Sequence, residues 1–174
     1  AFYSGAADCR IDGVLVSGYF QERDKLWEEP LYRNVWGLLE EFGDAEIAGL
    51  IAPRLLVIEA CKGPEIEGPP AASGGRKEVA APGRLITPPL KSVVAEVSEA
   101  EQIFKKLNIP SKFQLVISGN GEGLPGTMTT SEKLLIGLGV DVALSDELGV
   151  RPTALNNDFD SDACMRQQVN ELLN

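Results

Sequence analysis

Six residues decide the fold: Leu55-Leu56-Val57-Ile58-Glu59-Ala60 form the clearest strand pattern of the chain, with one charged residue among apolar ones. A continuous apolar run of this length predicts a β-strand covered on both faces, as in a parallel sheet with helices packed on each side. Two other short apolar runs, at 11–17 and 113–118, are each followed by a glycine. We therefore expect three parallel strands that are neighbours in one sheet, flanked by helices.

Helical patterns separate these strands. Apolar spacing and capping residues predict helices over 1–8, 31–42, 45–50, 92–107, 129–138 and 162–173. Strands that alternate with helices predict an α/β fold with a parallel sheet. Three strands are few for this class, because both faces and both edges of such a sheet need cover. We therefore expect an N-terminal portion of the domain to lie outside this chain, and the sheet edge beside 11–17 to be unpaired or filled by another chain.

The segment 61–91 is rich in Gly and Pro, and this density of helix and strand breakers predicts a long loop. A loop this long inside a compact domain is usually functional or disordered. Beyond Gly139 the apolar pattern fades. The sequence therefore predicts one domain over 1–139, followed at 140–174 by a linker and the start of another helix.

Composition narrows the classes of function. The 174 residues carry a formal net charge of -10. Nucleic acids and anionic membranes are bound through clustered cations, so neither is an expected partner. No apolar run approaches the roughly 20 residues that span a bilayer. The three cysteines are widely spaced and form no Cys-x-x-Cys pair, so no metal or cofactor is predicted and the compartment stays open.

The chain contains no histidine. Histidine is the usual general base near neutral pH, because its unperturbed pKa is about 6.5. Ser–His–acid and Cys–His catalysis by the residues of this chain is therefore excluded, and most zinc sites are excluded with it. Taken alone, the chain is not expected to be a working serine hydrolase.

A family resemblance begins just before the clearest strand. The stretch Leu50-Ile51-Ala52-Pro53-Arg54-Leu55-Leu56-Val57-Ile58 resembles α/β-hydrolases of the dienelactone hydrolase and acetyl xylan esterase kind, in which a similar stretch leads into the strand before the catalytic acid. The segments 16–20 and 33–39 fit the same neighbourhood, and the resemblance covers residues 1–138. It implies the C-terminal portion of an α/β-hydrolase fold, with a Ser–acid–His triad in that chain order and the serine upstream of Ala1.

Two residues of this implied triad are missing from the chain. No Ser has Gly both two residues before and two residues after it. The histidine should follow the third strand, where the chain has Ser118-Gly119-Asn120-Gly121-Glu122-Gly123. For the acid, the loop after the second strand offers Glu65 and Glu67, with Glu59 on the strand itself, and Glu65 is the best placed. The alternative interpretation of Glu65 is a solvated loop glutamate.

Three other patterns are weaker. The glycines of 119–123 resemble a phosphate-binding loop but lack the G-x-G-x-x-G spacing, which favours a simple turn. The alternate aspartates of 158–162 resemble a calcium loop but lack its Gly and Glu, which favours an acidic linker. For Trp27 and Trp36 we expect packing in the core or under a lid rather than a platform for a sugar.

Two hypotheses on function stay open. In the first, the chain is part of a hydrolase-fold protein that in full-length form hydrolyses carboxylic esters by acyl transfer, with the missing groups supplied from outside this chain. In the second, it is a catalytically degenerate hydrolase-like domain that serves binding or domain packing. The expected partners are the rest of the parent polypeptide or a partner domain, with a small-molecule ester under the first hypothesis.

Overall fold

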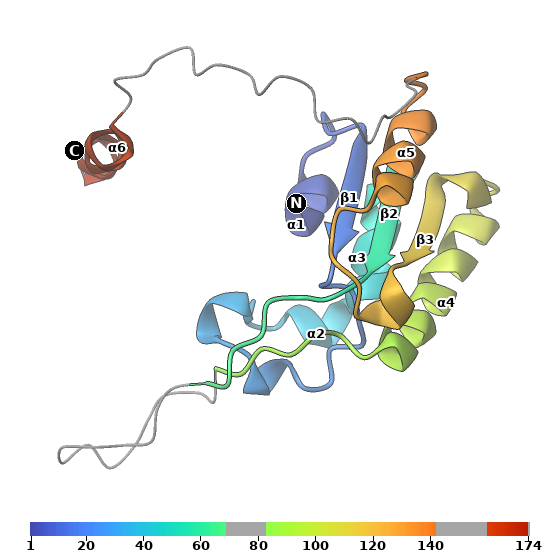
Figure 1. Ribbon diagram of the computed structural model, residues 1–174, viewed down its shortest axis with the longest axis horizontal. Helices are drawn as coiled ribbons and strands as arrows, with labels where there is room; N and C mark the ends of the chain where they lie inside the picture. The colour runs from blue at the N-terminus through green and yellow to red at the C-terminus, as the bar shows by residue number, and fades with distance from the viewer. Residues whose placement is uncertain (69–82, 142–159, 174) are drawn as a thin grey trace. The chain divides into compact units, whose positions relative to one another are not determined.

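The computed structural model describes residues 1–68, 83–141 and 160–173 and shows a small α/β fold (Figure 1). Its sheet contains three parallel strands in the order β1 (Gly13–Ser17), β2 (Leu55–Ala60) and β3 (Phe113–Ile117). The prediction of three adjacent parallel strands is confirmed. Within the described residues β1 forms one edge of the sheet, and β2 lies at its centre.

Helices cover both faces of this sheet. On one face lie α1 (Phe2–Ala7), α3 (Asp44–Ile51) and α4 (Leu90–Lys106), and on the other lies α5 (Met128–Gly137). Every residue of β2 is buried, because the strand has a neighbour on each side and helices on both faces. This double cover explains why its sequence shows no alternation of polar and apolar residues.

Side chains alternate between two cores along β2. Leu56 and Ile58 point into the larger core, together with Phe104 of α4. Leu55 and Val57 point to the opposite face, where Leu134 of α5 packs against them. Burying each such side chain contributes about 1.5–3 kcal/mol relative to leaving it exposed. The central strand therefore anchors both layers of helices.

The segment between β1 and α3 is not the long helix that the sequence predicted over 31–42. It contains only the short elements η1 (Leu26–Glu28), η2 (Leu31–Arg33) and α2 (Leu38–Glu41). Gly37 interrupts the helical pattern with a φ of 74°, a left-handed conformation that favours glycine. Leu38 packs against the core, but Leu31, Val35, Leu39 and Phe42 stay exposed, so little core surface stabilises a continuous helix over 31–42.

The segments that leave the carboxyl ends of the strands meet closely. Gly18, after β1, has a φ of 60°, and its carbonyl oxygen lies 2.6 Å from where a Cβ on Gly63 would be. The amide of Lys62 donates to the carbonyl oxygen of Gly123, after β3, at 2.8 Å. Backbone contacts therefore join all three connections at the end of the sheet where open α/β proteins bind ligands.

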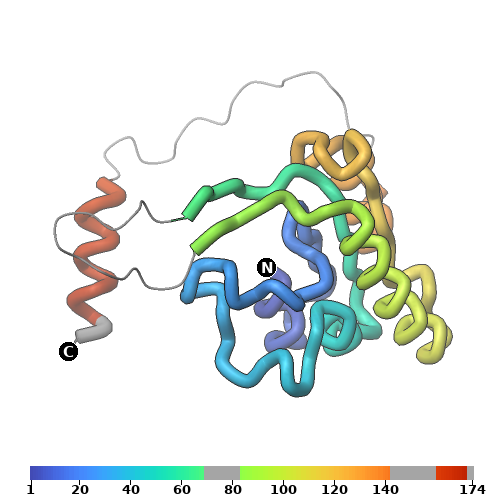
Figure 2. Tube along the Cα trace, turned by 90° about the horizontal axis from the view of Figure 1, so that it is seen from below, coloured from blue at the N-terminus to red at the C-terminus, as the bar shows by residue number. Residues whose placement is uncertain are grey.

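The two described parts of the predicted loop over 61–91 run beside each other when the sheet is seen from its carboxyl ends (Figure 2). Ile66 and Leu85 form an isolated antiparallel bridge, with N···O distances of 3.0 and 2.8 Å. α4 follows at Leu90, slightly earlier than predicted. The bridge holds the two ends of the loop together.

The chain divides into two units, residues 1–144 and 145–174. The described part of the second unit is α6 (Ser161–Leu173), close to the predicted helix over 162–173. Asp160 accepts hydrogen bonds from the amides of Asp162 and Ala163, both at 3.0 Å, at the start of this helix. None of the described helices is long and apolar enough to cross a membrane.

Candidate functional site

The most completely bonded side chain at the carboxyl end of the sheet is Glu59, near the end of β2. Its carboxylate accepts hydrogen bonds from the hydroxyls of Ser17 at 2.6 Å, Thr127 at 3.0 Å and Thr130 at 2.6 Å. The amides of Gly126 and Thr127 also donate to it, at 2.8 and 3.1 Å. Glu59 is 1% exposed, so these donors take the place of water around a buried charge.

This set of donors fixes the charge state of Glu59. Burial alone would raise its pKa, but the hydrogen bonds from Ser17, Thr130 and the two backbone amides outweigh burial and lower the pKa to about 2. The carboxylate is therefore ionised near neutral pH. Thr127 is also the N-cap of α5, so the charge lies where the positive end of the helix dipole stabilises it. Glu59 joins β1, β2 and α5.

Cys61 follows β2 directly and is buried. Burial raises the pKa of its thiol to about 11, and the neighbouring negative charge of Glu59 adds to this rise. The thiolate is the nucleophilic form of cysteine, and it is scarce near neutral pH at such a pKa. Cys61 is therefore not placed to act as a nucleophile.

Glu65, the acid implied by the hydrolase resemblance, lies in the loop after β2 with its side chain half exposed. It accepts a hydrogen bond from the Thr87 hydroxyl at 2.9 Å, and its carboxylate lies 3.5 Å from the Lys62 ammonium group. The Thr87 hydroxyl in turn accepts from the amide of Gly63 at 3.2 Å. These contacts, Thr87 first and Lys62 second, lower the pKa of Glu65. These contacts connect the segment after β2 to the segment before α4.

The segment after β3 forms the short η4 (Gly119–Gly121) where the resemblance implies a histidine. The amides of Gly121 and Gly123 both donate to the carbonyl oxygen of Ser118 at 2.9 Å. Two of the three glycine amides are thus engaged inside the turn and are not directed at a ligand. This geometry supports a turn rather than a phosphate-binding loop.

A second buried polar cluster centres on Arg23 and Asp44. The Arg23 Nε donates to both carboxylate oxygens of Asp44 at 3.1 Å, and an Nη lies 2.9 Å from one of them. The other Nη reaches Glu29 at 3.2 Å, and the guanidinium lies 3.9 Å from the centre of the Tyr19 ring. Burial opposes the charge of Arg23, but Asp44 and its other partners raise the pKa above the ordinary value. Arg23 therefore holds the segment after β1 against α3.

Glu96 of α4 has a carboxyl group whose pKa is raised to about 7. Burial is the main cause, and the nearby charge of Asp44 adds to it, whereas the hydrogen bond from the Ala45 amide at 2.6 Å opposes it. A pKa near 7 suits a general acid or base. Glu96 is 7% exposed and faces the first turn of α3, so no substrate reaches it in this structure.

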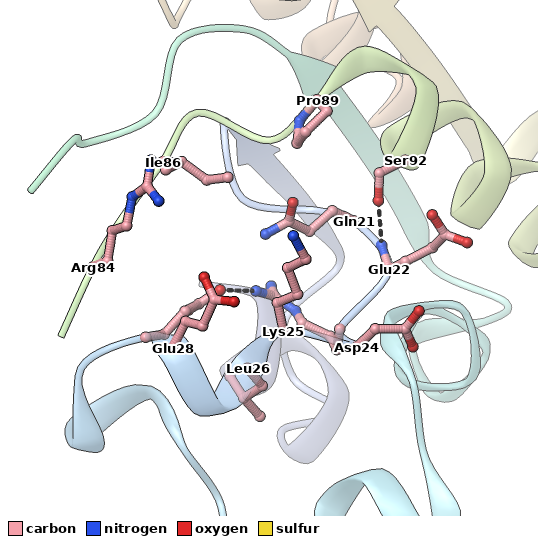
Figure 3. A pocket seen from close by; sticks show the side chains of 12 residues that line it. Gln21, Glu22, Asp24, Lys25, Leu26, Glu28, Arg84, Ile86, Pro89 and Ser92 are labelled. Carbon is pink, nitrogen blue, oxygen red and sulfur yellow. Dashed lines mark hydrogen bonds and ion pairs between the residues drawn. The ribbon is translucent and has the colours of Figure 1, made fainter. Parts of the chain in front are cut away.

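A cavity of about 250 Å³ lies on the carboxyl side of the sheet, between the segment after β1 and the start of α4 (Figure 3). Gln21 and Lys25 extend toward its centre, with Glu28 and Arg84 on its rim. Ser92 also lines this cavity, and its hydroxyl accepts a hydrogen bond from the Glu22 amide at 3.0 Å. The described lining mixes charges of both signs and contains no nucleophile bonded to a base.

Two weaker predictions from the sequence can be compared with the structure. Trp27 and Trp36 are 64% and 96% exposed, so the prediction that they pack in the core or under a lid is wrong. The alternate aspartates of 158–162 lie partly outside the described residues, and no group of three or more metal-ligating side chains occurs in the part that the structure describes.

No protein-family model matches this chain, and no curated protein or solved structure is significantly similar to it. The resemblance to α/β-hydrolases therefore stays a prediction from the sequence. The Glu59 network was not predicted as such, although the charge inside an apolar strand was the signal for it. A carboxylate at that position needs several donors, and Ser17, Thr127 and Thr130 provide them.

Proposed function

We propose that this chain forms a catalytically silent domain of the α/β-hydrolase type, which binds or packs against another polypeptide instead of hydrolysing esters. One observation carries the proposal: the carboxylate at the end of the central strand is fully engaged by five hydrogen bonds that join β1, β2 and α5. It is a structural carboxylate, and among the described residues no basic side chain contacts it. Of the other reactive groups at this end of the sheet, the Cys61 thiol has a raised pKa that keeps it protonated near neutral pH, and the Glu65 carboxylate is hydrogen-bonded to Thr87 in the loop.

The hydrolase type itself rests on the sequence resemblance at 50–58 together with the order of strands and helices. Fold analogy does not decide function, so the absence of catalysis must follow from the chemistry of the site. Acyl transfer through a serine needs a base that takes the hydroxyl proton. This chain has no histidine, and the described hydroxyls at the carboxyl ends are hydrogen-bonded to the carboxylates of Glu59 and Glu65 or to backbone groups.

Ester hydrolysis by a full-length protein remains the second candidate. The cavity beside Lys25 and Ser92 favours it, because open α/β sheets bind small ligands at the carboxyl ends of their strands. In that case both the nucleophile and the base must come from outside this chain.

A fluorophosphonate probe, which labels activated serines, tests the silent site. We expect the folded chain to take up no more label than the same chain after heat denaturation. A Glu65→Gln variant should behave identically, since Glu65 has no base to orient. Labelling that is specific to the folded chain and is lost in Glu65→Gln would overturn the proposal and restore the ester-hydrolase hypothesis.

A further inference from the structure

The segment between β1 and α3 exposes an unusual number of large apolar side chains. Over 27–42, which we call the aromatic segment, Trp36 is 96% exposed, Tyr32 77% and Trp27 64%. The other exposed members of the set are Leu31, Val35, Leu39 and Phe42. Single exposed apolar residues are ordinary, but a group of this size on one short segment marks an interaction surface.

A groove connects the aromatic segment to the open edge of the sheet. A cavity of about 430 Å³ is lined by Tyr32 and Val35 of the segment, by Tyr3 of α1 and by Leu15 of β1. Tyr19 completes the wall, and its hydroxyl donates to that of Tyr3 at 3.2 Å. The groove is therefore largely aromatic.

The floor of the groove offers free backbone groups. β1 pairs with β2 through its even-numbered positions, as the bonds of the Asp12 carbonyl and the Gly18 amide show. Backbone groups alternate in direction along a parallel strand, so those of Leu15 and Ser17 point away from β2. Unpaired groups on an edge strand invite a further polypeptide.

The charges around the aromatic segment are mostly negative. The one basic residue of the segment, Arg33, lies 3.3 Å from Glu29, and Arg23 just before the segment is held by Asp44 and Glu29. Lys25 and Arg84 are the nearby cations without a described ion pair, and the carboxylates outnumber them. Carboxylates without a described hydrogen bond or ion pair flank the apolar residues, namely Glu22, Asp24, Glu28, Glu40 and Glu41. A ligand for this surface must therefore combine apolar side chains with positive charge.

We infer that the aromatic segment and the groove beside β1 form the docking surface for a segment of another polypeptide that carries Lys or Arg next to apolar residues. Exposed indole and phenol rings bind such cations through their faces, and the flanking carboxylates add complementary charge. A second copy of the chain is disfavoured as the occupant, because each copy carries a net charge of -10. This inference rests on the proposed function and names its partner class.

Two synthetic peptides test the surface on the full chain. Both have the same apolar residues at alternate positions, as in an extended strand, and they carry either Lys or Glu at the polar positions. Binding is measured by isothermal titration calorimetry at low and at physiological salt. We expect the Lys peptide to bind and the Glu peptide not to bind. A double substitution, Tyr32→Ser with Trp36→Ser, should weaken binding by at least about tenfold.

Matched variants separate this surface from a general effect of charge. Glu40→Gln with Glu41→Gln should weaken binding of the Lys peptide, whereas Glu122→Gln with Glu132→Gln removes the same charge near α5 and should not. Ile136→Ser, on an exposed apolar residue of α5, is the control for Trp36→Ser. Equal losses in both carboxylate pairs, or no binding of the Lys peptide, would overturn the inference.

Two further outcomes are informative. A dimer in analytical ultracentrifugation that Trp36→Ser dissociates would assign the surface to a second copy and would contradict the inference. Failure of the docking surface is distinguishable from failure of the proposed function. An inactive chain that binds no Lys peptide contradicts only the surface, and a chain that binds the peptide and hydrolyses esters contradicts only the silent site.

Discussion

The Thr130 hydroxyl donates to the Glu59 carboxylate at 2.6 Å, which joins two residues that are 71 positions apart in the sequence. Thr130 is fully buried in the first turn of α5, and Glu59 is buried near the end of β2. The same carboxylate accepts a hydrogen bond from the hydroxyl of Ser17 in β1. A single charge thus holds an edge strand, the central strand and a helix together, and this role explains why an ionised side chain occupies an apolar strand.

Glu59→Gln should destabilise the protein by about 2–4 kcal/mol near neutral pH, because several hydrogen bonds to a charge are lost and the amide group of Gln faces backbone donors. The free energy of unfolding in urea measures the effect. Glu65→Gln, on a half-exposed carboxylate, is the control and should cost less than about 1 kcal/mol. Equal stability of the Glu59 variant and the wild type would show that the network contributes nothing.

The pH dependence of this effect has a definite sign. The pKa of Glu59 is lowered from an ordinary value of 4.5 to about 2, so its stabilisation is present above the ordinary value and is lost as the pH falls toward the folded value. The stability difference between wild type and Glu59→Gln should therefore shrink during acid titration. A difference that stays constant down to the acid end would contradict the assignment.

The contribution of Glu96 to stability should depend on pH with the opposite sign. Its folded pKa of about 7 lies above the ordinary value of 4.5, so folding favours its protonated form. The resulting stabilisation is full below the ordinary value and is lost as the pH rises through about 7. Glu96→Gln keeps an acceptor for the Ala45 amide without the charge, and it should make the protein more stable than wild type at mildly alkaline pH. Thermal unfolding across this pH range is the measurement.

Removal of Arg23 should be severely destabilising, because it leaves Asp44 buried without its partner. Arg23→Leu should cost about 3–5 kcal/mol. A double variant, Arg23→Leu with Asp44→Asn, removes both charges and should recover part of this loss. Urea unfolding of the two single variants and the double variant gives the coupling energy, and strict additivity would show that the two residues do not interact.

Cys9 and Cys61 should differ in reactivity. Cys9 is exposed and Cys61 is buried with a pKa of about 11, so a thiol reagent at neutral pH should label Cys9 rapidly and Cys61 only after unfolding. Mass spectrometry of peptides from a timed reaction locates the label. Rapid labelling of Cys61 in the folded chain would show that the carboxyl end of β2 is open to solvent.

The central strand was predictable from the sequence because burial on both faces leaves a continuous apolar run at 55–60. The helix over 92–107 was found for a related reason, since one face of α4 packs on the sheet and spaces its apolar residues accordingly. The helix over 31–42 was predicted wrongly. Its apolar residues have helical spacing, but all of them except Leu38 are exposed, and periodicity alone does not distinguish a core face from a docking surface.

The candidate site was predictable only in part. The sequence excluded a histidine base and pointed to Glu65, which the structure places in a half-exposed loop contact with Thr87. The importance of Glu59 depends on Thr130, which is distant in the sequence and is brought near by the position of α5. Hydrogen-bond networks of this kind form only in the folded chain, so no local sequence pattern predicts them.

The central claim is that the residues of this chain do not hydrolyse esters. Steady-state hydrolysis of p-nitrophenyl acetate by the purified full chain tests it most directly, with heat-denatured protein and buffer as controls. We predict that the rate rises linearly with substrate and does not exceed the denatured control. Saturable turnover that is abolished by one substitution, Glu65→Gln or Glu59→Gln in a variant shown to be folded, would contradict the account.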